Sequence, residues 1–242
     1  MKYLAYLPSV IYYLLFLLTL LIFHPIQWLS LKVGGYQAHK KSVDVMNCIL
    51  LNLLRVLGTR ISFTNQHELP KGVPYIIVAN HQSVNDIISI GYFLRKLHPK
   101  YISKKELGKN IPSVSFNLRH GGSVLIDRSS GSQSIKEIIK IGSYIEKNNR
   151  SAVIFPEGTR SRDGKPKPFY ENGLKFLVKK APSAYLLPVT INNSWKSLKY
   201  GGFPMALGVK LQLHVHKPLK VSDYEFEELF KTVEAQIKSK IV

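Results

Sequence analysis

A histidine and an aspartate five positions apart are the first residues whose types and spacing could do chemistry. His81 and Asp86 follow the apolar, β-branched run Tyr75–Ala79, which is typical of a strand buried on both faces. His81 would then lie at the carboxyl end of a strand, where ligands bind in open α/β sheets. A carboxylate that accepts the imidazole Nδ1–H fixes the tautomer and leaves Nε2 able to take a proton. The pair therefore has the chemistry of a general base.

Structural roles explain the same two residues without catalysis. Ser83 and Asp86 have the spacing of a helix capping box, so Asp86 could serve only as a cap and His81 as a turn residue. His39 and Asp44 repeat the spacing, but they lie in a basic connector with no strand before them. We interpret the spacing of His39 and Asp44 as coincidental, because only His81 and Asp86 follow a predicted strand.

Arg128 ends a second block, Gly-Ser-Val-Leu-Ile-Asp-Arg, which starts at Gly122 and contains a short predicted strand. A guanidinium group binds phosphate in a bidentate manner. The alternative for this arginine is an ion pair with Asp127 or Glu157.

The third block, Phe-Pro-Glu-Gly-Thr-Arg-Ser, starts at Phe155 and also follows a predicted strand. Gly158 and Thr159 form a turn whose backbone N–H groups could face an anion, and Arg160 adds a guanidinium group. Glu157 could either hold this turn or contact a ligand.

These blocks, followed by Leu187-Pro188-Val189, resemble in order the glycerolipid acyltransferase family, whose pattern is NHxxxxD, GxxFIxR, FPEGTRS and a proline-centred apolar block. Leu125 replaces the usual phenylalanine, and leucine is equally apolar at a strand position. The resemblance extends over about residues 57–189. It implies the glycerolipid acyltransferase fold, an α/β fold with a mostly parallel, helix-covered sheet.

The resemblance, which is greatest to the 1-acylglycerol-3-phosphate acyltransferases, also implies an activity. An acyl thioester of coenzyme A or acyl carrier protein would acylate the free hydroxyl of 1-acylglycerol-3-phosphate and give phosphatidate. His81 would be the general base, because an alcohol is a weak nucleophile at neutral pH, and Asp86 would orient it. The acceptor hydroxyl would attack directly, so we expect no acyl-enzyme, no metal and no other cofactor. The acceptor phosphate would lie near Arg128 and the third block.

Two alternatives stay open. The same chemistry could act on another acceptor, glycerol 3-phosphate or a lyso-aminolipid, because the shared motifs do not distinguish these. A non-catalytic protein that binds anionic lipid is the alternative from another class.

Positive charge is concentrated near the blocks. The 242 residues include 34 Lys or Arg and 15 Asp or Glu, a formal net charge of +19. Lys104 and Lys105 lie in a basic stretch after a short predicted strand, either placed for phosphate or on a solvated surface. The charge favours an anionic membrane or a phosphorylated substrate. We expect no nucleic-acid partner, because no recognised binding motif accompanies the charge. The single cysteine, Cys48, excludes an intramolecular disulfide.

The chain divides at about residue 57. Residues 3–31 are mostly apolar, but the uninterrupted part, 9–23, is short for a membrane span. A basic connector, 32–41, and a second, more polar apolar segment, 43–57, follow. We expect residues 1–57 to form a membrane-associated helical hairpin that enters one leaflet, on the cytoplasmic face of the inner (plasma) membrane. The alternatives are a true span by the first segment, or two helices that pack on the domain.

Residues 58–242 are expected to form the α/β domain that positions the blocks. Strands are predicted at 61–64, 75–79, 101–103, 123–126, 152–155, 186–191 and 211–215, and helices at 83–97, 132–146, 172–181 and 224–240. Strands separated by helices of this length favour a mostly parallel sheet.

Overall fold

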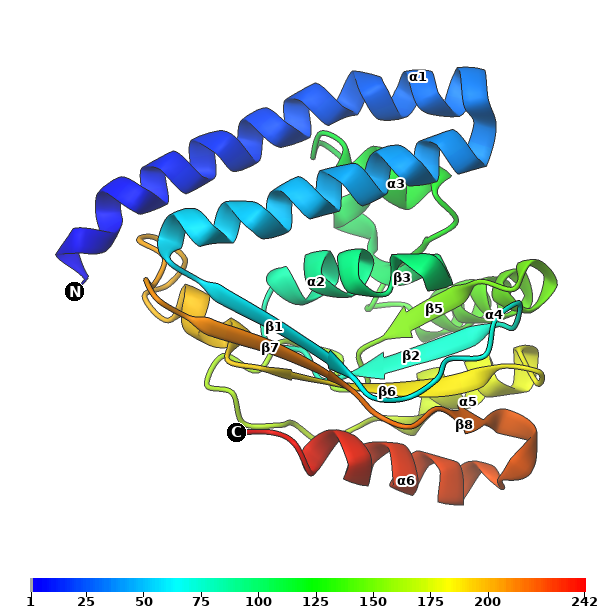
Figure 1. Cartoon of the computed structure of the whole chain (residues 1–242). Helices are drawn as coiled ribbons and strands as arrows, with labels where there is room; N and C mark the ends of the chain where they lie inside the picture. Colours follow the sequence, from blue (N-terminus) through cyan, green and yellow to red (C-terminus); the bar gives the residue numbers. More distant parts are fainter. Residues whose placement is uncertain (1) are drawn as a thin grey trace.

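Figure 1 shows a computed structural model of the chain, in which residues 2–242 are described. The amino-terminal segment consists of the 3-10 turn η1 (Tyr3–Ala5), the helix α1 (Tyr6–Leu53) and the turn η2 (Leu54–Leu57). Gly35, with φ 63° and ψ −155°, folds α1 into two arms (Figure 1). Glycine adopts this conformation readily because it has no Cβ. The predicted connector over residues 32–41 is wrong, since helix continues on both sides of Gly35.

An eight-stranded sheet forms the centre of the molecule, in the order β1-β7-β6-β2-β5-β3-β4, with β8 paired to β6. The strands are β1 (Arg60–Asn65), β2 (Tyr75–Ala79), β3 (Pro99–Lys104), β4 (Val124–Ile126), β5 (Ser151–Ile154), β6 (Tyr185–Asn192), β7 (Lys210–Val215) and β8 (Leu219–Lys220). The pairings of β6 with β7 and with β8 are antiparallel, and the others are parallel. The mostly parallel sheet predicted from the sequence is therefore confirmed.

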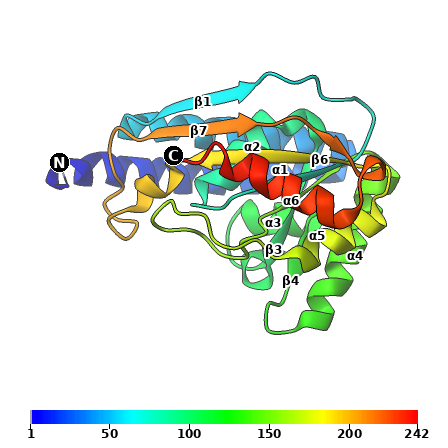
Figure 2. The same cartoon turned by 90° about the horizontal axis from the view of Figure 1, so that it is seen from below.

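Helices cover both faces of this sheet (Figures 1 and 2). They are α2 (Asn85–Phe93), α3 (Val114–His120), α4 (Gly131–Asn148), α5 (Glu171–Lys180) and α6 (Phe226–Lys238). Along β2, Ile77 and Ala79 belong to the core shared with α1 and α2, whereas Ile76 and Val78 belong to the core shared with α4, α5 and α6. This alternation places β2 between two apolar cores.

The two arms of α1 have different surroundings. Met46 and Leu50, in the second arm, are buried in the core, whereas Leu14 and Leu18, in the first arm, are 62% and 51% exposed. The segment Tyr3–Leu57 is long and apolar enough to cross a membrane. An exposed apolar helix of this kind indicates membrane association. Whether residues 1–57 and 58–242 behave as separate units stays a prediction.

Candidate active site

A hydrogen-bonded pair, His81 and Asp86, lies just beyond the carboxyl end of β2. His81 Nδ1 is 2.8 Å from Asp86 Oδ2. The same oxygen accepts backbone N–H bonds from Gln82 at 2.6 Å and Ser83 at 2.9 Å, and the Ser194 hydroxyl donates to Oδ1. Because these N–H groups can only donate, the carboxylate is an acceptor and His81 Nδ1 carries the hydrogen. The lone pair of the ring is therefore on Nε2.

Local sequence explains how the pair is held. The Asn80 side chain donates from Nδ2 to the carbonyl of Ile191 at 2.8 Å and accepts the N–H of the same residue at 2.7 Å, which ties the end of β2 to β6. Ser83 Oγ accepts the N–H of Asn85 at 3.1 Å, so α2 begins two residues later than predicted. Asp86 thus both caps the turn before α2 and holds the imidazole, and the two roles considered from the sequence coexist.

Burial and stacking fix the imidazole ring. The Asp86 side chain is fully buried, and the His81 side chain keeps 14% of its surface exposed. The Phe155 ring stacks on the imidazole with a centroid distance of 4.1 Å and an interplanar angle of 19°. The ring is restrained by Asp86 along one edge and by Phe155 on one face, as a positioned general base requires.

Glu157 connects the third block to the histidine. Its Oε1 accepts the backbone N–H of His81 at 2.8 Å, and its Oε2 accepts the backbone N–H of Lys167 at 3.0 Å. Burial raises the pKa of Glu157, while these two hydrogen bonds oppose the shift. The Ser161 N–H also donates to the His81 carbonyl at 2.7 Å. Of the two roles considered for Glu157, the contacts show that it holds the turn.

A cavity of about 580 Å³, with charged side chains among its lining residues, lies beside this turn. It is lined by Arg128, Gly131, Ser134, Glu157, Gly158, Thr159, Lys167, Pro168 and Tyr170. Lys167 Nζ donates to Thr159 Oγ1 at 2.8 Å and to the Arg160 carbonyl at 3.1 Å. Within residues 2–242, Arg128 forms no ion pair, because Asp127 pairs with Lys105 and the Glu157 oxygens accept backbone N–H groups. The cavity thus has two cationic side chains available to an anion.

Three basic residues named from the sequence lie outside the lining of this cavity. Arg160 and Lys104 are exposed. Lys105 pairs with Asp127, and the hydrogen bond from Lys105 lowers the pKa of Asp127 to about 2. Lys167 was missed, although it lies ten positions after Glu157 in the same basic loop.

Ser194 and Phe155 were also missed as contacts of His81 and Asp86. Ser194 approaches Asp86 from 108 positions away, and no sequence pattern indicates that contact. Phe155 belongs to the third block, but nothing in the block shows that its ring faces His81.

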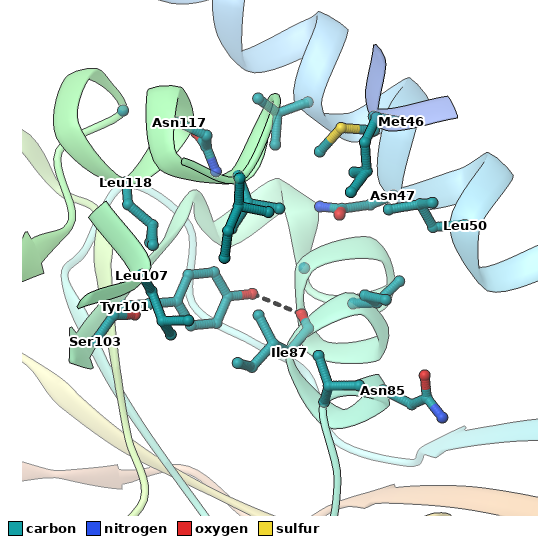
Figure 3. Close-up of a pocket in the computed structure, with 18 of the residues that line it drawn as sticks. Met46, Asn47, Leu50, Asn85, Ile87, Tyr101, Ser103, Leu107, Asn117 and Leu118 are labelled. Carbon is teal, nitrogen blue, oxygen red and sulfur yellow. Dashed lines mark hydrogen bonds between the residues drawn. The ribbon is translucent and has the colours of Figure 1, made fainter. Parts of the chain in front are cut away.

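A second cavity, of about 360 Å³, lies between α1, α2, α3 and β3 (Figure 3). Its lining is mainly apolar and includes Phe16, Leu20, Leu50, Ile88, Leu107 and Leu118. Tyr101 crosses its wall and donates to the Ile87 carbonyl at 2.9 Å (Figure 3). Val84 and Asn85 also line it, so one end of this apolar cavity lies beside the segment that carries His81 and Asp86.

A family model described as acyltransferase matches residues 60–192, which include all the blocks discussed above. The chain belongs to the acyltransferase family. This confirms the expectation of an O-acyltransferase drawn from the sequence. Among residues 2–242, no group of three or more His, Cys, Asp or Glu side chains is arranged to hold a metal ion.

Several acyltransferase relatives carry the name 1-acyl-sn-glycerol-3-phosphate acyltransferase. The protein from Borreliella burgdorferi is 31% identical over 198 residues, which cover 80% of this chain and 76% of the relative. The protein from Helicobacter pylori is 37% identical over 50% of this chain and 49% of its own length. The protein from Saccharomyces cerevisiae is 30% identical over 61% of this chain and 48% of its own length.

The fold of this acyltransferase matches a solved structure over the whole chain. The crystal structure of the 1-acyl-sn-glycerophosphate acyltransferase PlsC from Thermotoga maritima aligns with a TM-score of 0.82 and 24% identity, covering 100% of this chain and 96% of that one. The expected glycerolipid acyltransferase fold, with its amino-terminal helical segment, is confirmed.

Proposed function

We propose that this acyltransferase transfers an acyl chain from a thioester of coenzyme A or acyl carrier protein to the free hydroxyl of 1-acylglycerol-3-phosphate, giving phosphatidate. The observation that carries the proposal is the 2.8 Å bond between His81 Nδ1 and the buried Asp86 carboxylate, which leaves Nε2 as the proton acceptor. The relatives named for this activity support the choice of acceptor.

The proposed reaction needs no covalent enzyme intermediate. His81 Nε2 takes the proton of the acceptor hydroxyl as its oxygen attacks the thioester carbonyl, and Asp86 stabilises the imidazolium that forms. The tetrahedral intermediate then collapses, the C–S bond breaks, and the thiolate leaves and takes the proton back from Nε2. The acceptor oxygen forms the new ester bond, so atoms and charges balance with the thioester as the only co-substrate.

The acceptor phosphate is proposed to lie in the cavity of about 580 Å³. Arg128 and Lys167 line this cavity, and Thr159 lies in the turn that Glu157 ties to His81. A dianionic headgroup bound to two cations near that turn would place the glycerol carbons close to the imidazole. Arg160 and Lys104, which are exposed, are proposed only as outer attractors of anionic lipid.

The acyl chain of the donor is proposed to occupy the apolar cavity of about 360 Å³. Its lining by side chains such as Leu50 and Leu118 suits an alkyl chain, and its end at Val84 and Asn85 would place the thioester carbonyl near His81. The apolar first arm of α1 would hold the enzyme in the leaflet that contains acceptor and product. The basic excess favours the cytoplasmic face.

Thiol release with a panel of acceptors tests the proposal. Purified protein is given acyl-CoA with 1-acylglycerol-3-phosphate, glycerol 3-phosphate or a lyso-aminolipid, and we expect turnover mainly with the first. His81→Ala should lower kcat by about 10²- to 10⁴-fold, whereas His67→Ala, the matched control, should leave it unchanged. Turnover by His81→Ala at the wild-type rate would remove the general base from the mechanism, and preference for another acceptor would replace the substrate.

A further inference from the structure

A buried lysine lies in the wall of the apolar cavity. Lys100, the second residue of β3, lines the cavity and is only 6% exposed. Within residues 2–242 its ammonium group forms no hydrogen bond or ion pair, and its contact is with the Tyr36 ring, 4.8 Å from Nζ to the centroid. A lysine side chain this deeply buried loses most of its hydration, so this end of the cavity favours an anion.

The residues around Lys100 leave positive charge uncompensated. The Arg150 guanidinium lies 3.5 Å from the Tyr36 ring centroid, and Lys40 pairs with Asp44. Lys40 and Asp44 line the cavity together with Lys100, so the one carboxylate there is already paired and the charge of Lys100 is left without a partner. Burial, with the charges of Arg150 and Lys40, lowers the pKa of Lys100 to about 7. A bound anion would reverse this shift by stabilising the ammonium form.

His98 adds no compensating charge. Its Nδ1 is 2.9 Å from the Tyr36 hydroxyl, and burial lowers its pKa to about 4, so the ring is neutral near pH 7. His98 lines the same end of the cavity as Lys100.

The register of the strands gives the separation between Lys100 and His81 along the strand direction. Lys100 pairs with Ala152, and Ala152 pairs with Ile76, so these three residues are level across β3, β5 and β2. His81 lies five positions after Ile76, which corresponds to roughly 16 Å along the strand direction at about 3.3 Å per residue. The cavity thus has a cationic end near Lys100 and an opposite end at Val84, beside the imidazole.

We propose that the cavity binds a long-chain fatty acid anion, with its carboxylate on Lys100 and its alkyl chain extending toward Val84. A single charge at one end of an apolar body is the chemistry that this lining matches. The ligand runs in the opposite direction to a donor acyl chain, whose carbonyl carbon must lie at His81. A bound fatty acid therefore excludes the acyl chain of the donor. Fatty acid that is released when the thioester is hydrolysed would compete with the donor and inhibit the enzyme.

Direct binding tests this site without turnover. Labelled palmitate is equilibrated with the purified full-length protein in detergent, without thioester or lysolipid, and the signal of protein-free micelles is subtracted. Lys100→Met should weaken binding at least tenfold, Lys100→Arg should stay within threefold of the wild type, and Lys231→Met, a change of an exposed lysine on α6, should have no effect. Labelled 1-hexadecanol, which has no carboxylate, should bind the wild type and Lys100→Met equally.

Three results would overturn the proposal. They are no saturable palmitate binding by the wild type, equal palmitate binding by Lys100→Met, and an equal loss of palmitate and hexadecanol binding in Lys100→Met, which would show that Lys100 supports the cavity and does not bind the carboxylate. Because binding is read without catalysis, a protein that binds palmitate through Lys100 but transfers no acyl chain would refute the proposed function and leave this inference standing.

Discussion

The substitution Asp86→Asn tests the proposed catalytic pair most directly, because it removes one charge and almost no volume. The remaining carbonyl oxygen can keep the bonds from Gln82 N, Ser83 N and His81 Nδ1. The new amide group then faces the Ser194 hydroxyl, which can accept a hydrogen bond as well as donate one. We therefore expect the variant to fold with its imidazole in place.

The expected loss of rate follows from the change in one hydrogen bond. A bond to a charged partner contributes about 1.5–3 kcal/mol and a neutral one about 0.5–1.5 kcal/mol. The difference of about 1–2 kcal/mol applies to the imidazolium in the transition state, and 1.36 kcal/mol corresponds to tenfold in rate. The value of kcat should fall by roughly 5- to 30-fold. The acceptor KM should not change, because Asp86 does not line the cavity that contains Arg128.

Initial rates of thiol release at several acceptor concentrations, together with a thermal unfolding curve, measure these effects. Ser194→Ala is the matched control: it leaves the charge of Asp86 but removes a donor from its buried oxygen. That variant should lose about 1–3 kcal/mol of stability and less rate than Asp86→Asn. A kcat within twofold of the wild type for a folded Asp86→Asn protein would show that the carboxylate does not stabilise the imidazolium.

Three further predictions concern the regions around the pair. Arg128→Ala should raise the acceptor KM at least tenfold and leave the donor KM unchanged, whereas Arg160→Ala should change either KM less than threefold; equal effects in steady-state kinetics would contradict the placement of the phosphate. Between pH 7 and 9 the unfolded chain keeps a proton on Lys100 that the folded protein releases, so the folded state becomes more stable as the pH rises. Over this range the free energy of unfolding of the wild type should increase by up to about 2 kcal/mol relative to that of Lys100→Met, as measured by thermal unfolding. Parallel pH profiles for the two proteins would rule this out. Replacing Leu14 and Leu18 by Gln should lower co-sedimentation with anionic vesicles at least tenfold without changing the unfolding midpoint, because both side chains are more than half exposed.

The contact between His81 and Asp86 could be predicted from the sequence better than the set of cations around it. His81 and Asp86 interact through a short stretch of chain after a strand whose composition is unambiguous, so their contact depends on local geometry. Which cations line the cavity beside Arg128 depends on how the loop after Phe155 folds: Lys167 lines it, and Arg160 lies outside its lining. Exposed lysines and arginines follow no periodic sequence pattern, so the sequence does not indicate which way their side chains point.

The amino-terminal helix shows a second limit of sequence reasoning. Glycines within a basic stretch favour a loop, yet one residue, Gly35, accounts for the whole reversal and the helix continues on both sides. The surroundings of the buried Lys100 could not be predicted from the sequence either. Tyr36, Lys40 and Arg150 come near it only once α1 has packed beside β3 and β5.

The order of strands in the sheet has a consequence for synthesis on the ribosome. β1 emerges directly after the apolar helix, but its only neighbour among the described strands is β7, whose Lys210 pairs with Arg60. At about 5–20 residues per second, the first strand waits roughly 8–30 seconds before β7 is made, and both of its edges are unpaired during that time. Early insertion of the apolar helix α1 into the bilayer would place a lipid surface beside this strand during that interval.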